Sequence, residues 1–254
     1  MLITSTKNET VKLLRSLKER AGRRESGLHL IEGERLVFDA LISGVAPDTV
    51  LVEEGCEHIK ARLEGMGVAF ISVSRAVLEA VSDTKTPQGI AAAVKTPDTS
   101  PPPSYPKNAL IVALDRLQDP GNLGTILRSA DAMGAQAVIL GEGCTDAFSP
   151  KALRAAMGSA YHTPVYEGEL KTELLKLKSE GNTLICGHLS GSETLPELEA
   201  GCVLVIGNEG SGVSDEIAEV CTLFRLKMYG RAESLNASAA ASIMMYELSR
   251  LING

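Results

Sequence analysis

The sequence lacks the marks of a membrane-bound, secreted or metal-binding protein. No apolar run approaches the roughly eighteen residues that a membrane-spanning helix needs, and the N-terminal segment is amphipathic, unlike a signal peptide. The five cysteines stand singly, with no C-x-x-C pair and no histidine at the spacing of a zinc site. We therefore expect a cytoplasmic protein that holds no metal ion and does not bind membranes.

Common catalytic motifs are missing as well. The sequence has no G-x-S-x-G nucleophile elbow, no H-E-x-x-H motif and no Walker A loop. Gly141 and Gly143 begin a G-x-G pattern, but Asp146 occupies the position of the third glycine in a dinucleotide-binding loop. These absences disfavour the standard hydrolases, the NTPases and the classical NAD-dependent enzymes.

The composition is that of an ordinary folded protein, but its net charge is unfavourable for binding nucleic acid. Of the 254 residues, 44% are hydrophobic and 22% are charged, and the net charge is −7. Contacts from Lys and Arg to phosphate normally supply much of the affinity for nucleic acid. Residues 1–24 are locally basic, which indicates either an RNA-binding surface or a solvated helix face. The basic residues are Lys7, Lys12, Arg15, Lys18, Arg20, Arg23 and Arg24.

The chain divides at a proline-rich segment. Residues 96–108, TPDTSPPPSYPKN, contain three successive prolines and disfavour a helix or a central strand, so we predict a linker there. Residues 1–95 alternate short strand-like runs with helical patterns, which predicts a small α/β domain. Residues 109–254 contain four continuous apolar runs, which predict a parallel sheet covered on both faces: ALIVALD, AQAVILG, TLICGHL and CVLVIGNEG.

Polar segments follow these predicted strands, where parallel α/β folds usually bind ligands. In the first, residues 115–128, Pro120 and Gly121 predict a turn and Asn122 a helix cap. Arg128 lies on the same helix and is suited to bind phosphate, because its guanidinium is always charged and donates in a fork. A surface arginine on a capped helix is the alternative explanation.

Two further segments are similar in character. Glycines in residues 203–213 permit close approach of a ligand, and Glu209 is placed to accept backbone N–H bonds or to hold a basic side chain such as Arg128. Residues 226–242 begin irregularly and then predict a helix that starts near Asn236. Taken singly, Glu209 is equally explained as an exposed turn residue, and Ser234 or Asn236 as a helix cap.

Together, three motifs resemble the signatures of the SpoU/TrmH ribose methyltransferases of the SPOUT superfamily. They are N-x-G-x-x-x-R at Asn122 to Arg128, I-G-N-E-G-x-G at Ile206 to Gly212, and E-S-L-N-A-S at Glu233 to Ser238. Residues 148–165 resemble the segment between the first two motifs of this family. The N-terminal part, with IEGERLVFDAL and VSDTKTPQGIAAAV, is similar to the family's RNA substrate-binding domain. The resemblance covers nearly the whole chain.

The resemblance implies a fold, a cofactor and an oligomeric state. The catalytic domain would be an α/β SPOUT-type parallel sheet with a C-terminal trefoil knot, and it would form a homodimer and bind S-adenosylmethionine. The N-terminal domain would resemble RNA-binding domains of ribosomal proteins. The residues that match the cofactor-lining positions are Gly207, Leu226 and Leu235. The residues that match the catalytic site are Asn122, Arg128, Glu209, Ser234 and Asn236.

The implied reaction is methyl transfer to a ribose 2′-hydroxyl, with large-subunit (23S-type) ribosomal RNA as the preferred substrate and DNA excluded. Because that hydroxyl is a weak nucleophile, the enzyme must position and deprotonate it. We expect Arg128, oriented by Glu209 and bound to a substrate phosphate, to assist deprotonation or to act electrostatically. The alternatives are a tRNA 2′-O-methyltransferase, an inactive RNA-binding or ribosome-assembly protein of the same fold, and a different α/β enzyme. Housekeeping and antibiotic-resistance roles are both compatible with the sequence.

Overall fold

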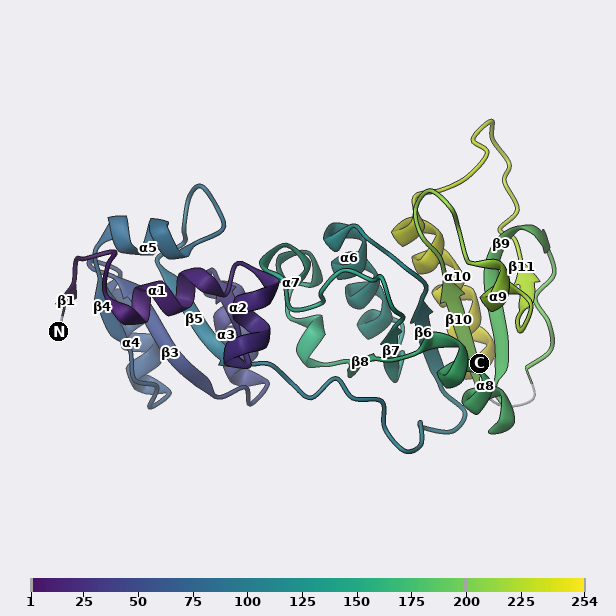
Figure 1. The fold of residues 1–254 in the computed structure, drawn as a ribbon, viewed down its shortest axis with the longest axis horizontal. Helices are drawn as coiled ribbons and strands as arrows, with labels where there is room; N and C mark the ends of the chain where they lie inside the picture. The colour runs from purple at the N-terminus through teal and green to yellow at the C-terminus, as the bar shows by residue number, and fades with distance from the viewer. Residues whose placement is uncertain (1, 199–200, 254) are drawn as a thin grey trace. The chain divides into compact units, whose positions relative to one another are not determined.

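The computed structural model describes residues 2–198 and 201–253, which divide into two compact units (Figure 1). The N-terminal unit contains the described residues up to Pro97 together with Phe148–Tyr161, and the C-terminal unit contains the others. The proline-rich segment 96–108 forms neither helix nor strand, as predicted. No helix in the described part of the chain is long and apolar enough to cross a membrane.

The N-terminal unit is built on a mixed sheet. Its strands are β1 (Leu2–Ile3), β2 (Leu28–Glu32), β3 (Pro47–Glu53), β4 (Ile71–Val73) and β5 (Ile90–Lys95). Their order is β1-β4-β3-β5-β2, and only the pairs that involve β5 are antiparallel. The helices are α1 (Glu9–Ser16), α2 (Arg20–Ser26), α3 (Glu34–Ile42), α4 (Glu57–Gly65) and α5 (Arg75–Val81). Val11, Leu14 and Leu17, at helical spacing, are fully buried in a core with residues of α5.

The C-terminal unit has six parallel strands. They are β6 (Leu110–Leu114), β7 (Ala137–Leu140), β8 (Val165–Glu167), β9 (Thr183–Ser192), β10 (Cys202–Ile206) and β11 (Thr222–Phe224). Their order is β11-β9-β10-β6-β7-β8. The helices are α6 (Pro120–Ala132), α8 (Leu170–Ser179), α9 (Asp215–Ala218) and α10 (Ala237–Asn253). The four apolar runs of the sequence are thus four of the strands.

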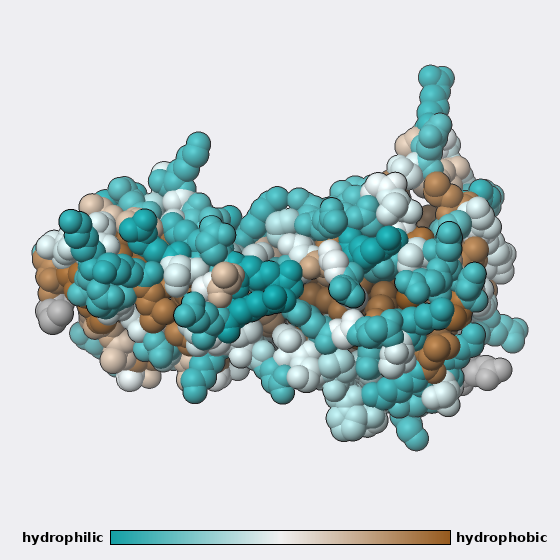
Figure 2. Space-filling model, in the orientation of Figure 1, coloured by the Kyte–Doolittle hydropathy of each residue, from teal (hydrophilic) through white to brown (hydrophobic). Residues whose placement is uncertain are grey.

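Helices cover both faces of this parallel sheet, as the continuous apolar runs predict. Leucines of α8 and Ile217 of α9 share one core with Ile111, Val203 and other strand residues. Helix α10 packs on α6 and contacts β6, β9 and β10, and the hydroxyls of Ser129 and Ser242 lie 2.7 Å apart between the two helices. The surface seen in Figure 2 is mostly hydrophilic, with hydrophobic residues in separate patches.

Residues Phe148–Tyr161 pack with the N-terminal unit, although they lie within the predicted catalytic domain, residues 109–254. This segment contains α7 (Pro150–Ala156), which contacts β2, and a short 3-10 helix. Arg154 of α7 donates to Glu32 of β2 at 2.7 Å. The compact units therefore differ from the predicted boundaries here, because the segment contacts β2, where the Phe148 ring lies 5.0 Å from the His29 ring.

Candidate active site

The loops that follow β6 and β10 are bound to each other at the carboxyl edge of the sheet. The two strands are neighbours, and the amide of Asp115 continues their ladder by donating to the Ile206 carbonyl at 2.9 Å. The buried Asp115 carboxylate accepts the amide of Ser214 at 2.6 Å. The Asn208 side chain donates to the Arg116 carbonyl at 2.9 Å. The first two motif loops are therefore held in one position relative to each other.

The second motif forms a tight hairpin. The backbones of Asn208 and Gly212 exchange two hydrogen bonds of 3.0 and 2.9 Å, and the Asn208 side-chain oxygen accepts the amides of Gly210 and Ser211. A Cβ atom at Gly207 would lie 2.1 Å from the backbone carbon of Gly212, so only glycine fits there. The hairpin projects Glu209, which is exposed, toward the loop after β6.

Glu209 receives three hydrogen bonds from the first motif. Its carboxylate accepts the amides of Gln118 at 3.3 Å and Asp119 at 3.0 Å and the side-chain N–H of Asn122 at 3.1 Å. Partial burial raises the pKa of Glu209, but these donors outweigh that effect and hold the pKa below its ordinary value. Glu209 is therefore an ionised acceptor that orients the Asn122 amide.

Helix α6 begins differently from the sequence prediction. Asp119, not Asn122, is its N-cap, because the Asp119 carboxylate accepts the Asn122 amide at 2.8 Å and Pro120 occupies the first helical position. Asn122 is thus inside the first turn, where its side chain is available to reach Glu209. The prediction that Asn122 caps the helix was wrong, since Asp119 stands three residues earlier in a better position.

The third motif joins the same network through the start of α10. The Asn236 side-chain N–H donates to Asn122 Oδ1 at 3.0 Å, and Asn236 Oδ1 accepts the amide of Ser238 at 2.9 Å. Asn236 therefore caps α10, which begins near it as predicted. Its side-chain nitrogen bonds Asn122, so Asn236 both caps α10 and joins the motif network.

Ser238 is a further member of the network that the sequence did not single out. Its side chain is in a residue only 7% exposed, and its Oγ lies 2.6 Å from Asn236 Oδ1 and 3.2 Å from Asn122 Oδ1. One hydroxyl thus contacts both amides. The available signal was its place at the end of E-S-L-N-A-S, two residues after Asn236, where a helix cap is expected to bond.

Arg128 and Ser234 lie outside this network. Arg128 is exposed, and within residues 2–198 and 201–253 no ion pair joins it to Glu209. Arg128 follows Asn122 by six residues, which in an α-helix turns its side chain by about 240° around the helix axis. The two side chains therefore cannot both face Glu209. The predicted orientation of Arg128 by Glu209 is therefore not observed. Ser234 is exposed in the irregular segment before α10.

The residues expected to line a cofactor lie at the ends of two loops. Gly207 is buried under its hairpin, Leu226 is half-buried, and Leu235 is 38% exposed. Among the described residues, no backbone-to-backbone hydrogen bond involves positions 226–235, so their N–H and C=O groups are available to a ligand. Apolar side chains beside free backbone donors and acceptors suit an adenine ring, which has apolar faces and a polar edge. The segment fits S-adenosylmethionine.

No group of three or more His, Cys, Asp or Glu side chains in the described ranges is arranged to hold a metal ion. The cysteines are unpaired thiols, and burial raises the pKa of Cys144 to about 11. Cys144, Cys186 and Cys202 are buried, Cys56 and Cys221 are partly buried, and none of the five belongs to the motif network.

Known proteins are similar to this chain in sequence and fold. Residues 109–246 match the SpoU rRNA Methylase family, and residues 8–92 match the MRM3-like substrate binding domain. The 23S rRNA (guanosine(2553)-2'-O)-methyltransferase RlmP of Bacillus subtilis is 38% identical over 97% of this chain and 98% of its own. Mitochondrial rRNA methyltransferase 3 of Homo sapiens is 32% identical over 94% of this chain and 71% of its own.

Solved structures agree with the sequence matches. The AdoMet-bound rRNA methyltransferase from Sinorhizobium meliloti has a TM-score of 0.86 and 33% identity, covering 98% of this chain and 97% of that one. The SpoU methyltransferase AviRb from Streptomyces viridochromogenes, in complex with AdoMet, has a TM-score of 0.85 and 26% identity over 98% and 100% of the two chains. The chain belongs to the SpoU rRNA methylase family. The predictions of a parallel α/β fold and of an RNA methyltransferase are confirmed.

Proposed function

We propose that this protein transfers a methyl group from S-adenosylmethionine to a ribose 2′-hydroxyl of large-subunit ribosomal RNA. The observation that carries the proposal is the bonded network of Glu209, Asn122 and Asn236, which brings the three motifs to one place. RlmP, which acts on 23S rRNA, is similar over almost the entire chain. S-adenosylmethionine supplies the electrophilic methyl group, so the protein has only to hold and deprotonate the acceptor.

The roles of the site residues follow from their contacts. Glu209 fixes the Asn122 amide, and Asn122 and Asn236 together form a polar wall against which a ribose hydroxyl can be held. Arg128, exposed and outside the network, anchors a substrate phosphate and stabilises developing negative charge. Ser234 contacts the substrate from the irregular loop. Gly207, Leu226 and Leu235 hold the methyl donor.

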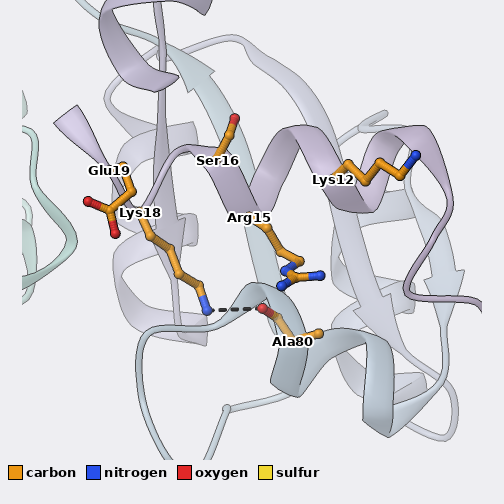
Figure 3. A pocket seen from close by; sticks show the side chains of 6 residues that line it. All are labelled: Lys12, Arg15, Ser16, Lys18, Glu19 and Ala80. Carbon is orange, nitrogen blue, oxygen red and sulfur yellow. Dashed lines mark hydrogen bonds between the residues drawn. The ribbon is translucent and has the colours of Figure 1, made fainter. Parts of the chain in front are cut away.

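We propose that residues 1–95 bind RNA, residues 96–108 link the domains, and residues 109–254 carry catalysis. The basic N-terminal surface is smaller than the sequence predicts. Figure 3 shows Lys18 donating to the Ala80 carbonyl, a bond of 3.0 Å. The Lys18 ammonium also donates to the Ser82 carbonyl and so closes the end of α5. Burial lowers the pKa of Lys18. Arg23 is buried and donates to the carbonyls of Leu17 and Lys18.

A groove beside α1 is lined by Lys12, Arg15, Ser16, Lys18, Glu19 and Ala80 (Figure 3). Its remaining candidates for phosphate contact are the exposed Arg15 and Lys12, of which Lys12 already pairs with Glu9 at 2.7 Å. Reversing the charge of Arg15 with Arg15→Glu is expected to weaken RNA binding and to lower the salt slope of log K by about one. Lys107→Glu, in the exposed linker, is the matched control. An unchanged slope for Arg15→Glu contradicts this assignment. Point variants are needed because removing residues 1–97 would uncover the apolar side chains of 148–161.

A homodimer through the C-terminal unit is part of the proposal. Helix α10 buries Met244, Met245 and Leu248 in its own unit, whereas Ile243, Tyr246 and Leu251 remain 44%, 50% and 55% exposed. A helix with a second apolar face is typical of a subunit contact. We also propose the trefoil knot, because the chain returns from the edge strand β11 to pack α10 against the central strands. A cytoplasmic location remains a prediction from the sequence.

The substrate is tested with labelled S-adenosylmethionine and unmodified transcripts of large-subunit rRNA and of tRNA. The proposal expects label in the rRNA and none in the tRNA. Label in tRNA alone would assign the protein to tRNA modification. Cofactor binding without transfer to any RNA would favour an inactive RNA-binding or assembly protein.

A further inference from the structure

The N-terminal unit contains a cavity that the methyl-transfer site does not use. Its volume is about 440 Å³, within the range of roughly 300 to 1,000 Å³ typical of small-molecule sites. Three separate parts of the chain form its walls: the start of α3, the loop between α5 and β5, and α7. The lining residues that matter below are Gly33, Arg35, Leu36, Thr86, Gln88 and Met157.

Ion pairs fix the frame of this cavity. Glu32, also in its lining, is only 8% exposed, and its carboxylate accepts Arg154 Nη1 at 2.7 Å and the Asp83 amide at 3.0 Å. The second guanidinium nitrogen of Arg154 donates to the Asp83 carboxylate at 2.8 Å. The Arg154 guanidinium thus bridges the carboxylates of Glu32 and Asp83 and holds the two in place. The walls are therefore set before any ligand arrives.

Other polar groups in the cavity are available. Gln88 and Thr86 are exposed, and among the contacts of the described residues neither side chain has a hydrogen-bond partner. Gly33 has φ +90°, and a Cβ there would lie 2.8 Å from Gln88 Oε1, so glycine leaves room for that amide. The amide and the hydroxyl each offer both a donor and an acceptor. This combination matches the polar edge of a nucleobase.

The remaining lining suits the other parts of a nucleotide. Leu36 and Met157 give apolar contact to a flat ring. The Arg35 side chain is 70% exposed, and its contact with Asp39 is a long 3.7 Å. An exposed guanidinium with so weak a partner can bind phosphate.

We propose that this cavity binds one unstacked nucleotide of the RNA substrate, with its base edge against Gln88 and Thr86 and its phosphate against Arg35. The inference rests on the proposed function, since the ligand is the RNA that the protein methylates. Bases inside an A-form duplex cannot enter a cavity, whereas bases of loops and bulges can be splayed out. The cavity therefore selects a single-stranded element of the substrate.

The test measures equilibrium binding of the full-length protein to an unmodified large-subunit rRNA transcript, without S-adenosylmethionine. Gln88→Ala and Thr86→Val each remove one hydrogen-bonding group, and each is expected to raise the Kd about 5- to 10-fold. Thr86→Phe, which fills the cavity, is expected to do the same. The matched control is Gln136→Ala, an exposed glutamine of the C-terminal unit, which is expected to bind as wild type.

Methyl transfer separates this inference from the proposed function. The cavity variants are expected to raise KM for RNA, with kcat and the affinity for S-adenosylmethionine unchanged, which also shows that they fold. Variants that bind the transcript as tightly as Gln136→Ala overturn the cavity site even if the wild type methylates rRNA. A wild type that binds the transcript but transfers no methyl group overturns the proposed function, while the binding comparison still decides the cavity. If the wild-type protein does not bind the transcript at all, both the cavity site and the proposed function are overturned.

Discussion

The side-chain N–H of Asn122 donates to the carboxylate of Glu209 over 3.1 Å, although the two residues are 87 positions apart in the sequence. Each belongs to a different motif loop, and β6 and β10 bring these loops together because they are neighbours in the sheet. The bond leaves Asn122 Oδ1 to accept from Asn236 of the third motif. Loss of this bond would free the Asn122 side chain, while other bonds, such as that from Asn208 to the Arg116 carbonyl, would still hold the first two motif loops together.

Asn122 and Glu209 are expected to act as one unit. Asn122→Ala and Glu209→Ala should each lower kcat by about 100-fold, and the double variant should lose little more, because either change breaks the same bond. Single-turnover methyl transfer to rRNA measures the three values. Multiplicative losses in the double variant would show that the residues act independently.

Glu209 also links stability to pH. Its folded pKa lies below the ordinary 4.5, so its ionised form stabilises the hairpin above the unfolded pKa, and this contribution is lost as the pH falls through the folded pKa. Glu209→Gln is therefore expected to lower the urea midpoint at pH 7, and its difference from wild type should shrink toward pH 3. A difference that is constant over this range contradicts the account.

Ser238 contacts the side-chain amides of both Asn122 and Asn236 through its hydroxyl. Ser238→Ala removes the hydroxyl that contacts Asn122 and Asn236, so kcat should fall about 10-fold while KM for RNA and S-adenosylmethionine affinity stay unchanged. Ser238→Thr keeps the hydroxyl and should restore part of the rate. Loss of cofactor affinity in Ser238→Ala, with no rescue by threonine, would indicate a structural role only.

Arg128 is exposed, so its removal leaves the folded protein intact. Arg128→Ala should reduce methyl transfer by at least about 100-fold, because the proposed phosphate anchor and the charge proposed to stabilise the transition state are both lost. Isothermal titration should give the wild-type affinity for S-adenosylmethionine. Arg128→Lys should recover little, since lysine lacks the fork. Retained turnover in Arg128→Ala would contradict its place in the site.

The exposed face of α10 predicts the oligomeric state. Tyr246→Glu places a charge on that face and should convert a dimer into a monomer, because an unpaired buried charge costs several kcal/mol at an interface. Light scattering during gel filtration measures the mass. Lys171→Glu, on α8, is the control and should leave the mass unchanged. A wild type that elutes as a monomer would refute the dimer directly.

The sequence predicts the strands well because burial on both faces leaves an unmistakable pattern. All four apolar runs of the C-terminal unit are strands, and the proline-rich segment is irregular as expected. The short edge strands β8 and β11 were missed, because three residues carry too little periodicity to read. The affiliation of Phe148–Tyr161 was missed as well, since local patterns do not say which core receives an apolar side chain.

The sequence named several residues that lie together in the structure, but it did not predict which of them bond each other. Asn122, Glu209 and Asn236 come together, whereas the expected partnership of Glu209 with Arg128 is not observed. Hydrogen-bond partners between residues far apart in the sequence depend on side-chain direction, which tertiary contacts settle. Asp119 rather than Asn122 caps α6, which Pro120 at the first helical position could have indicated, and Ser238 was passed over although it stands two residues after Asn236, where a helix cap is expected to bond.

The most direct test of the central claim is the position of the methyl group on the RNA. A labelled rRNA product is digested with alkali, which cleaves only where a free 2′-hydroxyl can attack the adjacent phosphate. The account predicts that the label is recovered in an alkali-resistant dinucleotide that yields a 2′-O-methylated nucleoside. Label recovered in a single nucleotide with a methylated base would contradict it.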